Sequence, residues 1–222
     1  MPGVHEFGPL AAYPGRGVLL NWGGNGLQWI YFVTGRSLAS RARRAVPRDG
    51  SIVIEAADAS APPDVLRHYT CVQPTSHGLL VGNGDHIDQI AESIEGGVDL
   101  SAALALIEPE PDPPIYTPRI GALIANDPVL FSVARSSDGT TRRVVPWTER
   151  CPDSVAMLCT YAGTVEEPVG SAPLQLFSHL PSCDLVEAVW NALNPHRRVL
   201  LVAGRGGSTS SCRVLSNAEH HP

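Results

Sequence analysis

Lysine is absent from this chain of 222 residues, and all 16 basic residues are arginine. Schiff-base catalysis and the phosphate-binding P-loop both need a lysine amine, so the composition excludes both. Arginine instead provides a planar, permanently charged guanidinium that suits phosphate and carboxylate groups. The formal net charge of −6 leaves no global basic field, so we expect no nucleic-acid partner.

Signals for disulfides, secretion and membrane insertion are also lacking. The five cysteines are odd in number and include no Cys-x-x-Cys pair, which argues against a disulfide framework or a zinc knuckle. The first residues, Met-Pro-Gly-Val-His-Glu, have neither the basic nor the apolar region of a signal peptide. No apolar run approaches the roughly 20 residues that span a bilayer. These features predict a cytoplasmic protein with free thiols and no membrane partner.

Glycine and proline are abundant, at 21 and 20 residues, which favours turns and short strands over long helices. Apolar runs at 17–21 and 27–33 flank a glycine-rich turn and predict a β-hairpin. The apolar patterns predict further strands at 51–56, 78–81, 120–125, 129–134, 155–161 and 198–203, and helices at 85–94, 102–107 and 184–193.

Strand pairs cluster along the chain and the helices are segregated from them. This order predicts an α+β fold with antiparallel sheets. The sequence contains no convincing internal repeat or interdomain linker, so residues 1–203 are interpreted as one domain. Residues 204–222 are rich in glycine and serine and are expected to form a flexible tail.

Five segments together resemble the stand-alone IMP cyclohydrolases of archaeal type and their bacterial relatives. They are Tyr-Pro-Gly-Arg-Gly at 13–17, Tyr-Phe-Val-Thr-Gly-Arg-Ser at 31–37 with Arg41, His-Tyr-Thr-Cys at 68–71, Asn-Gly-Asp-His-Ile-Asp at 83–88 and the proline-rich stretch 110–120. The resemblance runs from about residue 13 to residue 203. It implies a four-layer αββα sandwich similar to the N-terminal nucleophile hydrolases. The processed nucleophile of those hydrolases is not implied here, because the chain starts with Met-Pro-Gly.

The resemblance also implies a reaction. This family cyclises 5-formamidoimidazole-4-carboxamide ribonucleotide to IMP: an amide nitrogen attacks the formyl carbonyl beside it, and the adduct loses water. Both reacting groups belong to one molecule, so the enzyme has to fix a rotamer and move protons. No metal, redox cofactor or protein nucleophile is required. The implied partner is a purine nucleotide, and the assembly of relatives implies a homo-oligomer.

The candidate substrate-binding residues near the N-terminus are arginines with a serine. Arg16 follows Pro-Gly in a turn, and the family motif favours an active-site arginine over a solvated turn residue. Arg36 and Ser37 follow an apolar strand and offer a guanidinium and a hydroxyl as a cradle for the 5′-phosphate. Arg43 and Arg44 are interpreted as part of an exposed basic face.

The candidate catalytic residues are a tyrosine, an amide and a carboxylate. Tyr69 matches a family tyrosine that can donate a proton or stabilise an oxyanion, although a structural tyrosine is the alternative. Asn83 and Asp85 suit the holding of a carboxamide and the acceptance of its proton, and Asp85 is also expected to cap a helix. His86 and Ile87 depart from the Gln and Thr common in relatives. This departure leaves the substrate open and makes His86 either an added acid or base or an exposed residue.

The proline-rich stretch supplies the remaining candidates. Glu110 is assigned to the ribose hydroxyls, Arg119 to a phosphate or to the orientation of a carboxylate, and Thr117 to substrate binding. A structural Glu–Arg pair in an ordered loop is the alternative. A mixed metal site is weighed and set aside, because nothing in the sequence fixes the geometry of its potential ligands, His68, Asp85, His86 and Asp88.

Three other functions stay open. The first is cyclisation of a purine-like nucleotide analogue in secondary metabolism, for which the arginine and alanine bias of a GC-rich bacterial genome is a weak argument. The second is a nucleotide-binding protein without catalytic activity. The third is an amidohydrolase with Cys71 as nucleophile, although Cys71 is interpreted as a packed thiol.

Overall fold

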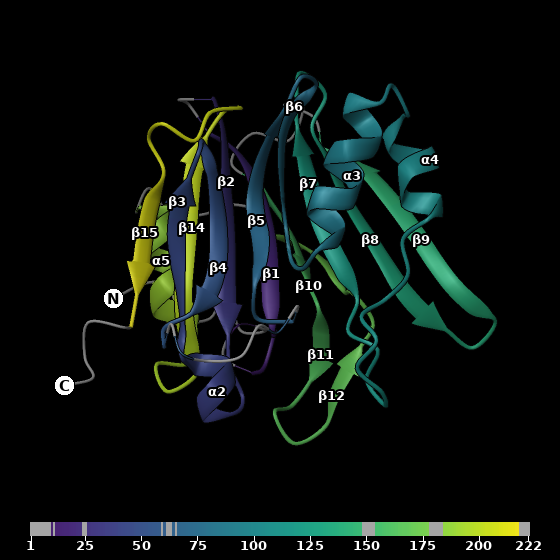
Figure 1. Cartoon of the computed structure of the whole chain (residues 1–222). Helices are drawn as coiled ribbons and strands as arrows, with labels where there is room; N and C mark the ends of the chain where they lie inside the picture. The colour runs from purple at the N-terminus through teal and green to yellow at the C-terminus, as the bar shows by residue number, and fades with distance from the viewer. Residues whose placement is uncertain are drawn as a thin grey trace.

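The computed structural model describes residues 10, 12–23, 26–58, 60, 64, 66–147, 154–177 and 184–217. The glycine-rich turn at 24–25, the cysteines at 151 and 183 and the end of the expected tail, 218–222, lie outside these residues. Two antiparallel sheets and a few short helices make up most of the described chain, as Figure 1 shows. The α+β class expected from the sequence is therefore confirmed.

The first sheet contains the predicted hairpin at its centre. Its strands follow the order β13–β10–β1–β2–β14–β15. Their bounds are Arg16–Gly23 (β1), Gly26–Thr34 (β2), Val155–Cys159 (β10), Leu174–Phe177 (β13), Arg198–Arg205 (β14) and Arg213–Ser216 (β15). Strand β15 pairs with β14 in the segment that was expected to be a flexible tail. The sheet thus extends beyond residue 203, which corrects that expectation for residues 213–216.

The second sheet has seven strands that pair in chain order, β3 to β9. Their bounds are Arg43–Arg48 (β3), Ser51–Ala56 (β4), Tyr69–Thr75 (β5), Gly78–Gly82 (β6), Arg119–Ile124 (β7), Val129–Ser136 (β8) and Gly139–Pro146 (β9). The sequence did not predict β3 and β9, because these edge strands are polar and mostly exposed and lack an apolar run. Two short strands, β11 (Tyr161–Gly163) and β12 (Pro168–Gly170), form a separate ribbon.

The helices are Leu38–Arg41 (α2), His86–Glu95 (α3), Leu100–Ala105 (α4) and Leu185–Ala192 (α5). Asp99 and Asp184 cap α4 and α5, because each carboxylate accepts a backbone N–H of the first turn. The predicted helices near 85–94, 102–107 and 184–193 are confirmed, with shifted ends. In the part of the chain that the structure describes, no helix is long and apolar enough to cross a membrane.

Alternating side chains of the two sheets build three apolar clusters. Val18, Tyr31, Val72 and Val81 belong to the largest cluster, which joins side chains of both sheets. Residues on the other face of the first sheet, such as Phe32, pack with α5. Residues on the other face of the second sheet pack with α3 and α4. Each sheet therefore has one face toward the other sheet and one face toward helices.

Antiparallel pairing gathers one set of strand ends at the same end of the molecule. In the first sheet Arg16 at the start of β1 pairs with Val33 near the end of β2. In the second sheet Gly82 at the end of β6 pairs with Gly121 near the start of β7. Strand β1 also contacts β6 and β7 of the opposite sheet. Residues that precede β1 and β7, or follow β6, are thereby brought together from distant parts of the sequence.

Candidate active site

A buried carboxylate between two arginines lies at this shared end. Glu110 Oε2 is 3.3 Å from Arg16 Nη1, and Glu110 Oε1 is 3.5 Å from Arg119 Nη1. The three residues are 1%, 8% and 6% exposed. Buried charges are rare unless they are paired, so this arrangement is a built feature of the fold. The structure brings together one candidate from the N-terminal turn and two from the proline-rich stretch.

Asn83 fixes Glu110 in place. Its amide nitrogen donates to Glu110 Oε1 at 3.1 Å and to the Pro118 carbonyl at 3.1 Å, and its Oδ1 accepts the Ile120 N–H at 2.6 Å. The next residue, Gly84, has a φ of +94°, and a Cβ there would lie 2.1 Å from Arg119 Nη1. The Asn-Gly pair of the motif therefore combines a fully engaged amide with a backbone that leaves room for the arginine.

Asp85 occupies the N-cap position of α3, yet its side chain makes no capping hydrogen bond. The carboxylate instead lies 2.7 Å from Arg119 Nη2, and its side chain is 43% exposed. Asp85 is thus at the expected N-cap position, but its carboxylate does not accept a backbone N–H of α3, so the expected capping hydrogen bond is wrong. Because Arg119 holds Asp85 with one terminal nitrogen and Glu110 with the other, the site has one buried and one accessible carboxylate.

Burial and pairing set the protonation of the central pair. Burial raises the pKa of the Glu110 carboxyl, and the charges of Arg16 and Arg119 counteract this rise. Burial alone would lower the pKa of Arg16, but Glu110 and the surrounding tyrosines hold it well above its usual value. Arg16 is therefore a permanent cation, while Glu110 is an acid that takes up a proton more readily than an exposed glutamate.

Two buried phenols meet beside this charged group. The hydroxyls of Tyr69 and Tyr31 are 2.7 Å apart, and the side chains are 4% and 0% exposed. Burial, with the neighbouring phenol, raises the pKa of Tyr31 well above its usual value, so Tyr31 stays protonated. The sequence singled out Tyr69 and not Tyr31, although both lie in segments that resemble the family.

Thr117 joins a second polar group from another part of the chain. Its hydroxyl donates to Asp112 Oδ2 at 2.5 Å and lies 2.6 Å from the Tyr161 hydroxyl. The Tyr161 ring stacks on Tyr13 at a centroid distance of 5.6 Å. Tyr161 was missed by the sequence reasoning, because a lone tyrosine after an apolar strand has no distinguishing local pattern. Sheet pairing, which places it beside Arg16, is the signal that finds it.

Arg36 and Ser37 lie at the surface, unlike the other candidates. Both are exposed, and Ser37 forms a reciprocal capping box with Ser40 at the start of α2. The serine hydroxyl that was expected to hold a phosphate accepts the Ser40 N–H in this structure. The two residues are therefore not part of the buried network.

Arg43 is buried, which corrects its interpretation as part of an exposed basic face. It is 4% exposed, and its Nε and Nη2 donate to the carbonyls of Ser40 and Thr34 at 2.7 and 3.4 Å. Burial, and to a lesser extent the charge of Arg16, lowers its pKa below the usual value. Arg44 is exposed and pairs with Glu55, as interpreted. The alternation of a strand explains the difference, since successive residues point to opposite faces.

His86 is buried rather than exposed. It is 1% exposed and meets the Phe131 ring edge-on, and neither ring nitrogen has a hydrogen-bond partner in the described chain. Burial lowers its pKa well below the usual value, and the charge of Arg119 lowers it further. The imidazole is thus neutral near pH 7. Ile87 beside it is fully buried as well.

The described residues give little support to metal or thiol chemistry. They contain no group of three or more His, Cys, Asp and Glu side chains that could hold a metal ion. Cys71 is fully buried, and burial raises the pKa of its thiol far above the usual value. A reactive cysteine needs an accessible thiolate with a lowered pKa, so Cys71 is a packed thiol.

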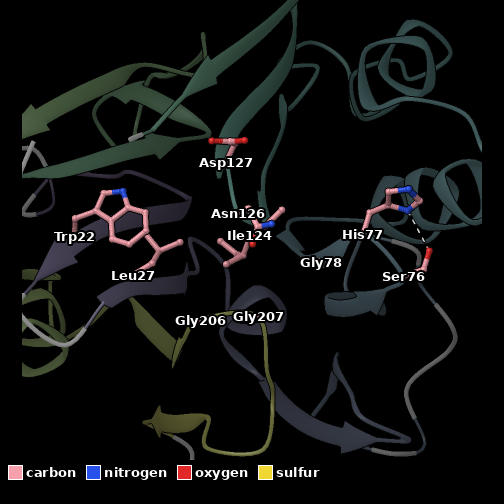
Figure 2. A pocket seen from close by; sticks show the side chains of 11 residues that line it. Trp22, Leu27, Ser76, His77, Gly78, Ile124, Asn126, Asp127, Gly206 and Gly207 are labelled. Atoms are coloured by element: carbon pink, nitrogen blue, oxygen red, sulfur yellow. Dashed lines mark hydrogen bonds between the residues drawn. The ribbon is translucent and has the colours of Figure 1, made fainter. Parts of the chain in front are cut away.

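A pocket of about 810 Å³ opens at the opposite end of the strands. Figure 2 shows Trp22 and Leu27 on one side of it, His77 on the other, and Ile124 with Asn126 between them. It is lined by Trp22, Leu27, 76–78, 124–127 and 206–207. None of the residues selected from the sequence as catalytic or substrate-binding lies in this lining.

Comparison with known proteins shows the family of this chain. Residues 13–206 match the family described as "IMP cyclohydrolase-like protein". An IMP cyclohydrolase of Methanothrix thermoacetophila is 30% identical over 165 residues, which cover 71% of this chain and 78% of that protein. One from Haloarcula marismortui is 36% identical over 44% of this chain and 49% of its own length. One from Halobacterium salinarum is 29% identical over 63% and 70%.

The matched region contains each of the cluster residues described above, from Tyr13 to Tyr161. It also includes every strand of both sheets except β15. The chain therefore belongs to the IMP cyclohydrolase-like family.

Proposed function

We propose that this chain is an IMP cyclohydrolase, which closes 5-formamidoimidazole-4-carboxamide ribonucleotide to IMP with loss of water. The observation that carries the proposal is the buried Glu110 between Arg16 and Arg119, at the end where both sheets converge. Relatives named IMP cyclohydrolase at 29% to 36% identity support it.

The reaction needs placement and proton transfer more than any added reagent. The carboxamide nitrogen attacks the formyl carbon, a C–N bond forms, and the former formyl oxygen becomes a hydroxyl. Loss of that hydroxyl with a proton from nitrogen releases water and completes the ring. Holding the two groups in the reactive rotamer turns the step into an oriented intramolecular one.

Tyr69 acts on the formyl oxygen. The hydroxyls of Tyr31 and Tyr69 share one hydrogen bond. When Tyr31, which stays protonated, donates this bond, the Tyr69 O–H is free to donate to the substrate. A donor aimed at the developing oxyanion stabilises the adduct. The same phenol then gives its proton to the departing hydroxyl, which leaves as water, and takes up the N–H proton that is lost as the C=N bond forms.

The carboxylates and their partners act on the other reacting group. Asp85, held by Arg119 and still accessible, accepts the proton of the carboxamide. Asn83 uses both amide hydrogens within the protein, so it serves this step by holding Glu110. Glu110 binds the ribose hydroxyls from its place between the arginines.

The remaining candidates bind the outer parts of the nucleotide. Arg16 and Arg119 provide positive charge for the anionic substrate. Arg36 and Ser37 approach it from the surface, beside the end of β2. Thr117 contributes through its contact with Asp112 and Tyr161.

The wider expectations from the sequence are part of this proposal. The layers of helix, sheet, sheet and helix are a four-layer αββα sandwich like that of the N-terminal nucleophile hydrolases. The protein acts in the cytoplasm of a bacterium on a purine nucleotide, without a metal or other cofactor, and assembles as a homo-oligomer. Nucleic acid and membranes are not its partners.

Ultraviolet absorbance tests the function directly. Purified protein is mixed with the formamidoimidazole carboxamide ribonucleotide, and the appearance of the hypoxanthine ring is followed. Conversion well above the spontaneous rate is expected, with an Asp85→Asn variant strongly impaired. Folded protein that gives only the spontaneous rate contradicts the proposal, and normal turnover by the variant removes Asp85 from the mechanism.

A second candidate keeps the chemistry and changes the substrate. His86 and Ile87, which depart from the residues common in relatives, are buried in the first turn of α3 next to Asp85. They motivate ring closure on a purine-like nucleotide analogue. Faster turnover of a close analogue than of the formamido nucleotide would favour this candidate. Tight nucleotide binding without any turnover would favour a silent binding protein.

A further inference from the structure

Arg43 is a buried cation for which the mechanism above has no use. It is the first residue of β3, at the edge of the second sheet, and its side chain turns inward. No carboxylate pairs with it in the described residues, unlike Arg16 and Arg119. Its two hydrogen bonds go to main-chain carbonyls, and Nη1 is left without an acceptor among those residues.

Hydrogen bonds place Arg43 beside the start of β1. Its Nη2 donates to the Thr34 carbonyl, and the Thr34 hydroxyl donates to the carbonyl of Gly15, the residue before Arg16. The charge of Arg16 also acts on the pKa of Arg43. Arg16 is paired with Glu110, so Arg43 is the buried cation here whose charge no carboxylate of the described residues offsets. A buried positive charge is costly unless an anion offsets it. The region therefore has the charge of an anion site.

We propose that Arg43, together with Arg16, forms a subsite for a phosphate monoester. A guanidinium binds a tetrahedral anion with several N–H groups at once. The phosphate would offset the charge of Arg43. The inference deepens the proposed function, on which it rests for the identity of the nucleotide. It moves the phosphate from the exposed pair Arg36 and Ser37 to the interior of the site.

The neighbouring residue provides a matched control. Arg44 belongs to the same strand and is exposed, with its guanidinium paired to Glu55. Arg43→Met and Arg44→Met remove the same charge one position apart. Arg43→Lys keeps the positive charge and loses the planar guanidinium with its several N–H donors. It serves as the second variant if Arg43→Met does not fold. Urea denaturation of each variant checks that the fold is retained.

Calorimetric titration with IMP, inosine and inorganic phosphate tests the subsite. Arg43→Met is expected to weaken IMP binding by about 10- to 100-fold, as for loss of a charged hydrogen-bond group. Inosine binding is expected to stay unchanged, and Arg44→Met to behave as the wild type. Arg43→Lys should fall between the two. Inorganic phosphate that competes with IMP shows that the subsite takes phosphate itself, whereas phosphate that fails to compete shows that it takes only the ester.

Three outcomes would overturn the inference. They are equal losses for IMP and inosine, equal effects of the Arg43 and Arg44 variants, and a wild-type protein that binds IMP no more tightly than inosine. These readouts are independent of turnover. An absence of cyclohydrolase activity with phosphate-dependent, Arg43-dependent binding would refute the proposed function and leave this subsite in place.

Discussion

The two ends of the stacked sheets are built from the same strands and differ in what they bury. At one end, Arg16, Glu110 and Arg119 are almost fully buried and hold each other. At the other end, the pocket of Figure 2 has the exposed polar residues His77 and Asp127, over an apolar floor that includes Ile124. Among the described residues, buried charged side chains therefore lie at the first end and not in the lining of the pocket.

This difference is the reason for placing the proposed active site at the end with buried charge and not at the pocket. Exposed polar turns cost nothing to form and are found on any surface. Even when charges are paired, the cost of desolvating them can exceed their attraction, so their presence at one end needs another reason. Ligand binding and proton transfer in a dry site are such a reason.

The largest effect is expected from breaking the central ion pair. Glu110→Gln leaves Arg16 buried without a carboxylate and should lower the free energy of unfolding by about 3 to 5 kcal/mol. Asp127→Asn, at the opposite end, changes an exposed carboxylate and should stay within about 0.5 kcal/mol. Urea denaturation measures both. Similar losses for the two variants would show that the ends do not differ as described.

Removal of the proposed phenol donor is the next largest effect. Tyr69→Phe should lower kcat by about 10²-fold, the loss typical of one oxyanion donor, because the ring still packs while the hydroxyl is gone. Steady-state turnover of the formamido nucleotide measures it. Trp22→Phe serves as the aromatic control at the other end and should leave kcat unchanged. Unaltered kcat in Tyr69→Phe would exclude the phenol from the reaction.

The pH dependence of stability should distinguish His86, beside the proposed active site, from His77, at the pocket. Unfolded, His86 takes up a proton near pH 6.5, whereas burial prevents this in the folded chain. The unfolded state then binds more protons below pH 6.5, so stability is full above that pH and falls by up to about 1.4 kcal/mol per pH unit as the pH drops.

Replacement of His86 is expected to remove this slope. Unfolding free energies of His86→Leu and His77→Leu, measured from pH 7 to pH 5, are compared with the wild type. The first variant should lose the contribution of one proton to the slope, and the second, exposed and distant, should retain it. Identical slopes in both variants would contradict the burial of a neutral imidazole.

The smallest effect is expected at the rim of the far pocket. Trp22 donates its indole N–H to the Trp147 carbonyl at 3.3 Å, so Trp22→Phe should cost about 1 kcal/mol of stability. Thermal unfolding with and without IMP measures this cost and the stabilisation by ligand. If IMP stabilised Trp22→Phe much less than the wild type, the nucleotide would bind at this end.

Much of the fold could be predicted from local patterns. The hairpin around residues 24–25 has long apolar runs on both sides, and α3 has Ile87, Ile90 and Ile94 at helical spacing. Burial of one face of an element requires such a pattern, so these elements could be predicted. Strands β3 and β9 and the late strand β15 were missed. They lie at sheet edges, where one side of the backbone pairs with no strand and many side chains face solvent. Such strands form without an apolar pattern in the sequence.

The candidate site could be predicted where several of its residues lie close together in one sequence motif. The proline-rich stretch and the Asn-Gly-Asp loop pointed to Glu110, Arg119, Asn83 and Asp85, all of which meet in the structure. Arg43 was misjudged, because the inward or outward direction of a residue in a polar edge strand depends on register. Local sequence cannot provide that register.

By itself, the sequence determined the chemical repertoire: arginine as the basic residue throughout, a polar loop before α3, and a proline-rich segment with two carboxylates. It also determined the α+β class through its apolar periodicity. Tertiary structure decided which of these groups are desolvated and which are not, Arg43 against Arg44 and His86 against His77. The reason is that a solvated charged side chain has no desolvation penalty at any position in the sequence. Whether a side chain is buried depends on contacts between strands more than a hundred residues apart.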